Sequence, residues 1–158
     1  MEMAIVLKSS VFKNGEPIPP GYTADGPDTS PPLEWSSLPK GAVELAIICD
    51  DPDAPRSEPW VHWVTYGIPA VTAGFLEGVP NTPTLEDPAG AAQGLNDFGR
   101  IGYGGPAPPR GKVHHYHFRI YALDQATRLP PRMTKSQLLE AMKGHILDEG
   151  LLIGTYRR

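Results

Sequence analysis

The chain has 158 residues and a formal net charge of −4, and it contains 17 glycines, 19 prolines and one cysteine. This length fits a single domain over residues 1–158 and excludes a separate cofactor-binding domain. The glycine and proline content predicts many turns and little helix, whereas 40% hydrophobic residues suffice for a core. The basic residues are scattered, so nucleic acid is a poor candidate partner, and the lone Cys49 excludes an intrachain disulfide.

The beginning of the chain offers no targeting signal. Its apolar run, residues 3–7, is shorter than the core of a signal peptide and far shorter than a membrane span. A single cysteine suits a reducing compartment. We therefore expect a cytoplasmic protein without stable membrane insertion.

Five short apolar segments bounded by Gly, Pro, Asp or Asn predict β-strands over residues 5–7, 43–49, 60–66, 116–122 and 151–156. Short strands with long Pro- and Gly-rich connections favour an antiparallel sandwich. One helix is predicted, because Thr134 and Gln137 form a capping-box pattern and an apolar stripe follows as far as Leu147. Gly150 would end this helix, with His145 in its last turn.

Three carboxylates follow the second predicted strand, in the sequence Asp-Asp-Pro-Asp-Ala-Pro that begins at Asp50. Side chains alternate along a strand, so Asp51 and Asp53 would project to one side. Pro52 has no backbone N–H to donate to a neighbouring strand, so it indicates an edge strand or a bend in the chain. In isolation, this segment is better explained as a solvated acidic turn.

The strand predicted from Trp60 carries a histidine. Alternation places Trp60, His62, Val64 and Tyr66 on one face, so His62 shares its face with bulky apolar groups. Taken alone, it is better explained as a core histidine that makes one hydrogen bond.

A second histidine-rich strand begins near His114. Alternation places His114 and Tyr116 on the face that becomes apolar further along, and His115 and His117 on the other face, which we expect to meet solvent. Polar groups that enter a core at one strand end can form the floor of a pocket. We therefore expect His62 and His114, but not His115 or His117, to line one pocket.

The segment from Gly102 to Pro109 formally contains the dinucleotide pattern G-x-G-x-x-A. Its three prolines forbid the helix whose N-terminus would hold a pyrophosphate, so we expect no nucleotide cofactor. The backbone amides of Gly104 and Gly105 could still line a small anion pocket.

The order Asp-Pro-Asp-Ala-Pro, Trp-x-His, Gly-Gly-Pro-x-Pro-Pro and His-x-Tyr resembles the phosphatidylethanolamine-binding protein family, which includes the Raf kinase inhibitor proteins. The resemblance extends over nearly the whole chain, and its end is similar to the shorter bacterial and archaeal branch. The connection from Pro55 to Trp60 is shorter than in animal members. Lipid-headgroup selectivity and Raf binding are therefore not carried over.

This resemblance implies a mostly β fold, a sandwich of two antiparallel sheets with Greek-key connections and one main C-terminal helix. It also implies a small anion pocket without metal or other cofactor. The ligand-binding residues at the matching positions are Asp51, Asp53, Pro55, Trp60, His62, Gly105, Pro106, His114 and Tyr116. Cis peptide bonds are expected before Pro55 and, by the same comparison, before Pro59.

A binding role suits these residues. A carboxylate beside a histidine favours imidazolium, and imidazolium, a tyrosine hydroxyl and glycine amides could hold a phosphate or carboxylate. One of Asp51 and Asp53 must then orient a histidine, and the other must be paired or shielded. We expect a non-enzymatic protein for a phosphate-like or carboxylate small ligand. The family resemblance adds inhibition of a protein kinase or protease as a regulatory role, and a homodimer as the assembly.

Two alternatives remain open at this point. The first is an acid–base hydrolase or phosphoryl-transfer enzyme that uses the Asp, His and Tyr residues. It lacks a nucleophile, because no Ser or Cys stands at a strand end inside these motifs and Cys49 lies within a buried run. The second is a metal site of two histidines and two carboxylates.

Overall fold

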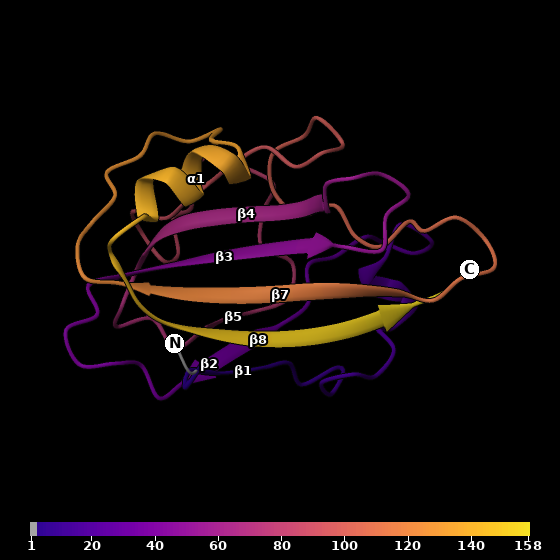
Figure 1. The fold of residues 1–158 in the computed structure, drawn as a ribbon, viewed down its shortest axis with the longest axis horizontal. Coiled ribbons are helices and arrows are strands. Elements are labelled where there is room, and N and C mark those ends of the chain that lie inside the picture. The colour runs from indigo at the N-terminus through magenta and orange to yellow at the C-terminus, as the bar shows by residue number, and fades with distance from the viewer. Residues whose placement is uncertain (1–2) are drawn as a thin grey trace.

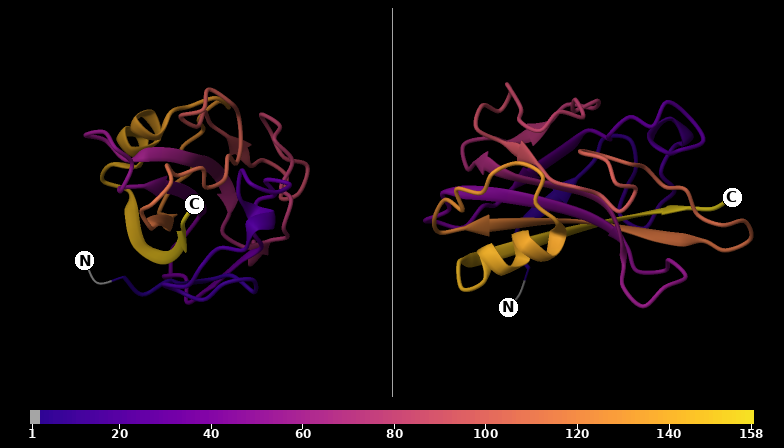
Figure 2. Two further views of the ribbon diagram at one scale, coloured as in Figure 1. Left: turned by 90° about the vertical axis from the view of Figure 1, so that its right-hand side faces the viewer. Right: turned by 90° about the horizontal axis from the view of Figure 1, so that it is seen from above.

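The computed structural model describes residues 3–158 as two antiparallel β-sheets packed face to face (Figures 1 and 2). The three-stranded sheet has the order β1-β2-β5 and contains β1 Val6–Lys8, β2 Leu33–Ser36 and β5 Gly74–Phe75. The five-stranded sheet has the order β6-β4-β3-β7-β8 and contains β3 Glu44–Asp51, β4 Trp60–Pro69, β6 Ala92–Gln93, β7 His114–Leu123 and β8 Ile146–Tyr156. The expected mostly β sandwich is confirmed, and β7 returns beside β3 as the fourth strand of a Greek key does.

One apolar cluster fills the space between the two sheets. Alternate residues of β3 (Leu45, Ile47 and Cys49) and of β7 (Phe118 and Ile120) are buried there, as the two-residue period of a strand requires. Each fully buried side chain of this size contributes about 1.5–3 kcal/mol to stability. This core holds the strand ends that form the site in fixed positions.

Helix α1, Lys135–Met142, covers part of the opposite face of the five-stranded sheet (Figure 2). Leu138 and Met142 pack there against residues of β3, β4 and β7. The predicted capping box is present: the Gln137 amide donates to Thr134 Oγ1 at 3.2 Å, and the Thr134 amide donates to Gln137 Oε1 at 3.0 Å. Among the described residues, no helix has the length and apolarity needed to cross a bilayer.

The helix is shorter than its apolar stripe predicts. It is followed by Gly144, whose φ of 82° is left-handed, and the chain then enters β8 at Ile146. Ile146 and the residues after it pair with β7, so this long-range ladder outweighs the local helical pattern. Gly150 therefore lies inside β8 and does not end the helix. His145 lies outside the helix, with its Nδ1 atom 3.0 Å from Asp124 Oδ1.

Strand β4 contains a β-bulge that its sequence does not reveal. Cys49 pairs with Trp63 whereas Asp50 pairs with Val61, so His62 is the extra residue. An extra residue shifts the alternation of the side chains beyond it. Trp63 consequently joins the core between the sheets, while Val64 and Tyr66 pack on the helix side. The prediction that Val64 and Tyr66 share a face with His62 is therefore wrong.

The expected cis bonds before Pro55 and Pro59 are also wrong. Within residues 3–158 the cis peptide bond is Asp87-Pro88. The turn after β3 is instead closed by Asp51, whose Oδ1 atom accepts from the Asp53 amide at 2.8 Å. A side-chain hydrogen bond of this kind turns the chain while every bond keeps the preferred trans form.

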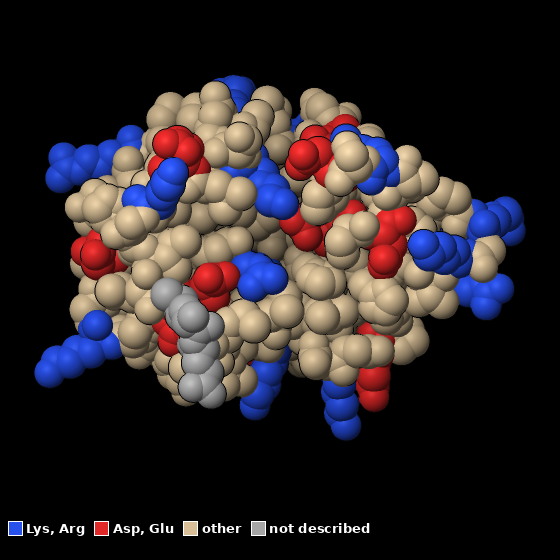
Figure 3. Space-filling view, in the orientation of Figure 1, with Lys and Arg blue, Asp and Glu red and all other residues tan. Residues whose placement is uncertain are grey.

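Acidic and basic side chains are interspersed over the face formed by α1 and the outer side of the five-stranded sheet (Figure 3). The formal net charge of the chain is −4. Charges of both signs in alternation produce a weak long-range field. This face therefore does not present a surface of one sign.

Candidate functional site

A cavity of about 190 Å³ opens where β3 ends and where β4 and β7 begin, at one end of the five-stranded sheet (Figure 1). Two connections complete its wall, the one between β3 and β4 and the one between β6 and β7. It is lined by Asp51, Ala54, Pro55, Trp60, His62, Phe98, Ala107, Pro108, Pro109, His114 and Tyr116. Six of the nine residues expected in a ligand site therefore come together in one cavity.

Asp51 and His114 form a buried pair in this cavity. The Nδ1 atom of His114 lies 2.6 Å from Asp51 Oδ2, and the two side chains are 3% and 5% exposed. A carboxylate only accepts, so Nδ1 carries the proton and Nε2 is the ring nitrogen left for the cavity. Since Asp51 Oδ1 accepts from the Asp53 amide, this one carboxylate orients His114 and closes the adjoining turn. The structure thus places His114, not His115, beside Asp51.

His62 is held by a backbone carbonyl. Its Nδ1 atom lies 2.5 Å from the carbonyl oxygen of Gly104. Burial lowers the pKa of His62, although the Gly104 carbonyl and the Asp51 charge act in the opposite direction. At neutral pH this ring is therefore uncharged, in contrast to the imidazolium that the sequence suggests.

Two residues that line the cavity each have a polar side-chain atom without a partner. Trp60 Nε1 and Tyr116 Oη are buried, and neither makes a hydrogen bond within residues 3–158. Leaving such a group unpaired costs about 1–3 kcal/mol. Burial, with a smaller contribution from Asp51, raises the pKa of Tyr116, so its hydroxyl keeps its proton. Both atoms can therefore donate to a group bound in the cavity.

Phe98 is a cavity residue that sequence reasoning missed. Its ring makes edge contacts with Trp60 and His62, with centroid separations of 5.4 Å in both cases. Tyr116 meets His62 in the same way at 5.1 Å. No local pattern marks Phe98, because its place in the cavity depends on how a loop folds back against β4.

Three expected site residues lie outside the cavity lining. Asp53 Oδ2 accepts from the backbone amide and the ring Nδ1 of His115, at 2.8 and 2.7 Å. Burial raises the pKa of Asp53, but the His115 hydrogen bonds outweigh it and the net shift is downward. Gly105 and Pro106 lie in the neighbouring loop, where the Gly105 amide donates to Asp28 Oδ1 at 2.8 Å.

The glycine amides are therefore not available to an anion. The Gly104 amide donates to the His62 carbonyl at 2.9 Å, and Gly105 is committed to Asp28. Sequence alone could not reveal this, because both acceptors are distant in the chain. The metal alternative also lacks a ligand set, since no group of three or more His, Cys, Asp or Glu side chains within residues 3–158 is placed to hold an ion.

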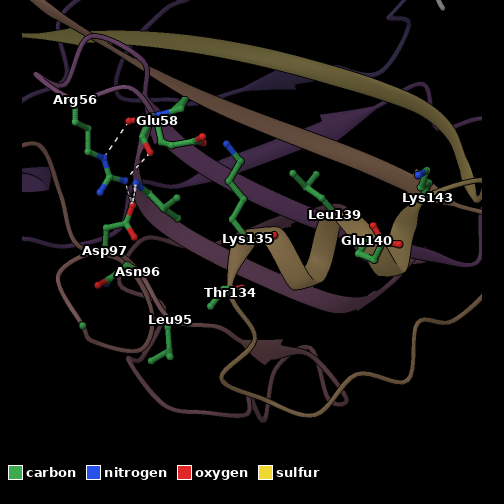
Figure 4. Close-up of a pocket in the computed structure, with 14 residues that line it drawn as sticks. Arg56, Glu58, Leu95, Asn96, Asp97, Thr134, Lys135, Leu139, Glu140 and Lys143 are labelled. Carbon is green, nitrogen blue, oxygen red and sulfur yellow. Dashed lines mark hydrogen bonds and ion pairs between the residues drawn. The ribbon is translucent and has the colours of Figure 1, made fainter.

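A larger groove of about 730 Å³ lies between α1 and the loops that precede β4 and follow β6 (Figure 4). Three of the charged side chains that line it are paired. Arg56 forms an ion pair with Asp97 and donates to the Glu58 carbonyl at 3.0 Å, and Lys135 Nζ lies 2.6 Å from Asp50 Oδ2. The buried side-chain atoms of residues 3–158 that lack a partner belong to residues that line the smaller cavity, so we take that cavity as the candidate site.

Known proteins share this sequence and this fold. A sequence model of the family described as phosphatidylethanolamine-binding protein matches residues 8–157. The chain belongs to the phosphatidylethanolamine-binding protein family. A UPF0098 protein of Methanothermobacter thermautotrophicus is 51% identical over 152 residues, which cover 96% of this chain and 98% of the relative. A UPF0098 protein of Pyrococcus horikoshii is 48% identical over 95% of this chain and 75% of the relative.

Solved structures agree with this family assignment. The phosphatidylethanolamine-binding protein homologue of Chlamydia trachomatis is 40% identical, with a TM-score of 0.88 over 99% of both chains. Escherichia coli YbcL, described as a new member of the mammalian PEBP family, is 30% identical, with a TM-score of 0.91 over 98% of both chains. The resemblance inferred from the sequence motifs is thereby confirmed.

Proposed function

We propose that the cavity binds a small oxyanion, namely the phosphate or carboxylate group of a small ligand. The observation that carries this proposal is the pair of buried, unpartnered donors, Trp60 Nε1 and Tyr116 Oη, in one cavity. Native proteins pair nearly all buried polar groups, so two unpaired donors on residues that line one cavity are best explained by a missing partner. An oxyanion accepts from both.

The remaining groups suit the same ligand. His114 is fixed by Asp51 with Nε2 left for the cavity, and with a proton on Nε2 it donates to an anion. The volume of about 190 Å³ is smaller than typical drug-sized sites. It therefore suits a headgroup-sized ligand. The names of the family and of the Chlamydia trachomatis homologue refer to a phosphate-containing lipid, which supports phosphate as the recognised group.

Titration calorimetry with inorganic phosphate tests this proposal. We expect His114→Ala to reduce affinity at least about tenfold, because hydrogen bonds to charged groups contribute about 1.5–3 kcal/mol. The matched control is His117→Ala on the opposite face of β7, which should leave affinity unchanged. Equal losses in the two variants would contradict a site at the cavity.

Hydrolysis is the second candidate function, and the Asp51–His114 pair favours it. A histidine whose Nδ1 proton is held by a carboxylate can act as a general base through Nε2. No Ser, Thr or Cys lines the cavity within the described residues, so water would have to be the nucleophile. Turnover of p-nitrophenyl phosphate or acetate that disappears in His114→Ala would establish this function.

A regulatory role toward a protein kinase or protease is a finer form of the binding proposal. Its support is the resemblance to the Raf kinase inhibitor proteins. If the cavity is involved, inhibition of a purified kinase or protease should be relieved by saturating phosphate. Inhibition that phosphate does not affect would separate the two properties.

A further inference from the structure

We infer that His62 makes the cavity selective for oxyanions that carry an ionisable proton, so that it prefers phosphate monoesters to sulfate esters and phosphodiesters. This inference rests on the proposed oxyanion site and adds the chemical class of its ligand. The shared chemistry is a P–OH group beside unprotonated oxygens. Inorganic phosphate and monoesters have it, whereas the phosphodiester of a phospholipid headgroup does not.

The first step is the tautomer of His62. The Gly104 carbonyl oxygen lies 2.5 Å from Nδ1 and can only accept, so Nδ1 must donate. The peptide group that carries this carbonyl is also held at its other end, because the Gly105 amide donates to Asp28 Oδ1 at 2.8 Å. The carbonyl therefore cannot turn away, and the neutral ring keeps its proton on Nδ1.

The second step is that Nε2 is consequently an acceptor. His62 is 3% exposed and lines the cavity, and no group within residues 3–158 bonds to its Nε2 atom. An oxyanion without a proton would place an oxygen lone pair against the lone pair of His62 Nε2, and the two would repel each other. A P–OH group donates to it, while Trp60 Nε1 and Tyr116 Oη donate to the other oxygens.

The charged groups around His62 do not reverse this assignment. Burial lowers the pKa of His62 and outweighs the backbone of Gly104 and Gly105 and the charges of Asp51 and Asp50, which all favour a positive ring. Tyr116, packed against the ring, keeps its proton, and the Nδ1 proton of His114 is directed to Asp51. The ring therefore stays neutral near pH 7.

Methyl phosphate and methyl sulfate form a suitable probe pair. The singly charged form of methyl phosphate carries a P–OH proton, whereas singly charged methyl sulfate carries none. A phosphate monoester has a second pKa of about 6, so its monoanion falls from about half of the total at pH 6 to about 1% at pH 8. Methyl sulfate does not titrate in this range, so it reports the titration of the protein alone. We expect the affinity ratio of methyl phosphate to methyl sulfate to fall about 50-fold between pH 6 and pH 8.

The variant His62→Asn tests the acceptor itself. Asparagine can still donate to the Gly104 carbonyl but places no acceptor at the Nε2 position. The affinity ratio at pH 6 should drop at least about tenfold in this variant. It should not change in His117→Asn, the same replacement on the opposite face. If His62→Asn does not fold, the ¹⁵N resonances of His62 in the wild-type protein decide the tautomer, and a protonated Nε2 in the neutral ring would overturn the inference.

The outcomes separate this inference from the site itself. If neither probe binds, the oxyanion site and the selectivity are both refuted. If both bind with a ratio that does not depend on pH, the site stands and the selectivity is refuted. Dimethyl phosphate represents the lipid-like source, and binding of it as tight as that of methyl phosphate would also refute the selectivity.

Discussion

Single proton positions decide what the cavity can bind. The two histidines of the cavity each use Nδ1 for a structural hydrogen bond, His114 to a carboxylate and His62 to a backbone carbonyl. The hydrogen-bond partner at Nδ1 thus gives two histidines different chemical properties. Residue type alone predicts two equivalent donors, whereas the structure contains a carboxylate-linked histidine and a neutral acceptor.

His62 should make stability depend on pH. Burial lowers its pKa below the ordinary 6.5, so below that pH the unfolded chain binds more protons than the folded one. Its contribution to the free energy of unfolding is therefore complete above pH 6.5 and is lost as the pH falls toward the folded pKa. Urea unfolding at pH 7.5 and 5.5 should show a smaller pH dependence in His62→Asn than in the wild type. An identical dependence would mean that folding leaves the pKa of His62 unchanged.

Asp51→Asn should weaken both the site and the fold. Asp51 accepts from His114 with one oxygen and from the Asp53 amide with the other, and asparagine offers a single acceptor. One of the two buried bonds is lost, which should cost about 1–3 kcal/mol. Phosphate affinity should fall with it. Asp53→Asn, outside the cavity lining, is the control and should keep its affinity; a similar loss there would point to the loop as a whole.

At the scale of elements, strand β8 depends on close contact with the N-terminal segment. A Cβ atom at Gly150 would lie 2.5 Å from the Ile5 carbonyl oxygen and 3.0 Å from Ile120 Cγ2. Because the first of these is backbone, the segments must move apart. Gly150→Ala should therefore lower the free energy of unfolding by about 1–3 kcal/mol.

Gly21→Ala is the matched control, because a Cβ atom there has no neighbour within 4 Å. Urea unfolding of the two variants compares them directly. Equal stability would show that the N-terminal segment yields at little cost. Phosphate affinity should stay unchanged in both variants, since neither residue lines the cavity.

In the whole molecule, the site exists because strand ends meet. Asp51 and His114 are 63 positions apart in the chain, yet β3 and β7 are antiparallel neighbours. The end of β3 and the start of β7 therefore lie side by side at one end of the sheet. The Greek-key return of β7 beside β3 is thus what completes the cavity.

The family could be predicted from the order of the sequence motifs, and strand β7 from its two-residue alternation, which is a local property. It correctly separated His114 and Tyr116 from His115 and His117. The sequence also revealed the start of α1 through the Thr134 cap, since capping is decided within one turn.

Other features of the fold and of the site depend on tertiary contacts. The bulge at His62, the length of α1, the pairing of Asp53 with His115 and the place of Phe98 each depend on partners distant in the chain. The short strands β2, β5 and β6 also carry too few residues for a local pattern. Local sequence specifies which way a side chain alternates, but the partner strand or loop fixes the register and thereby which hydrogen bonds remain for a ligand.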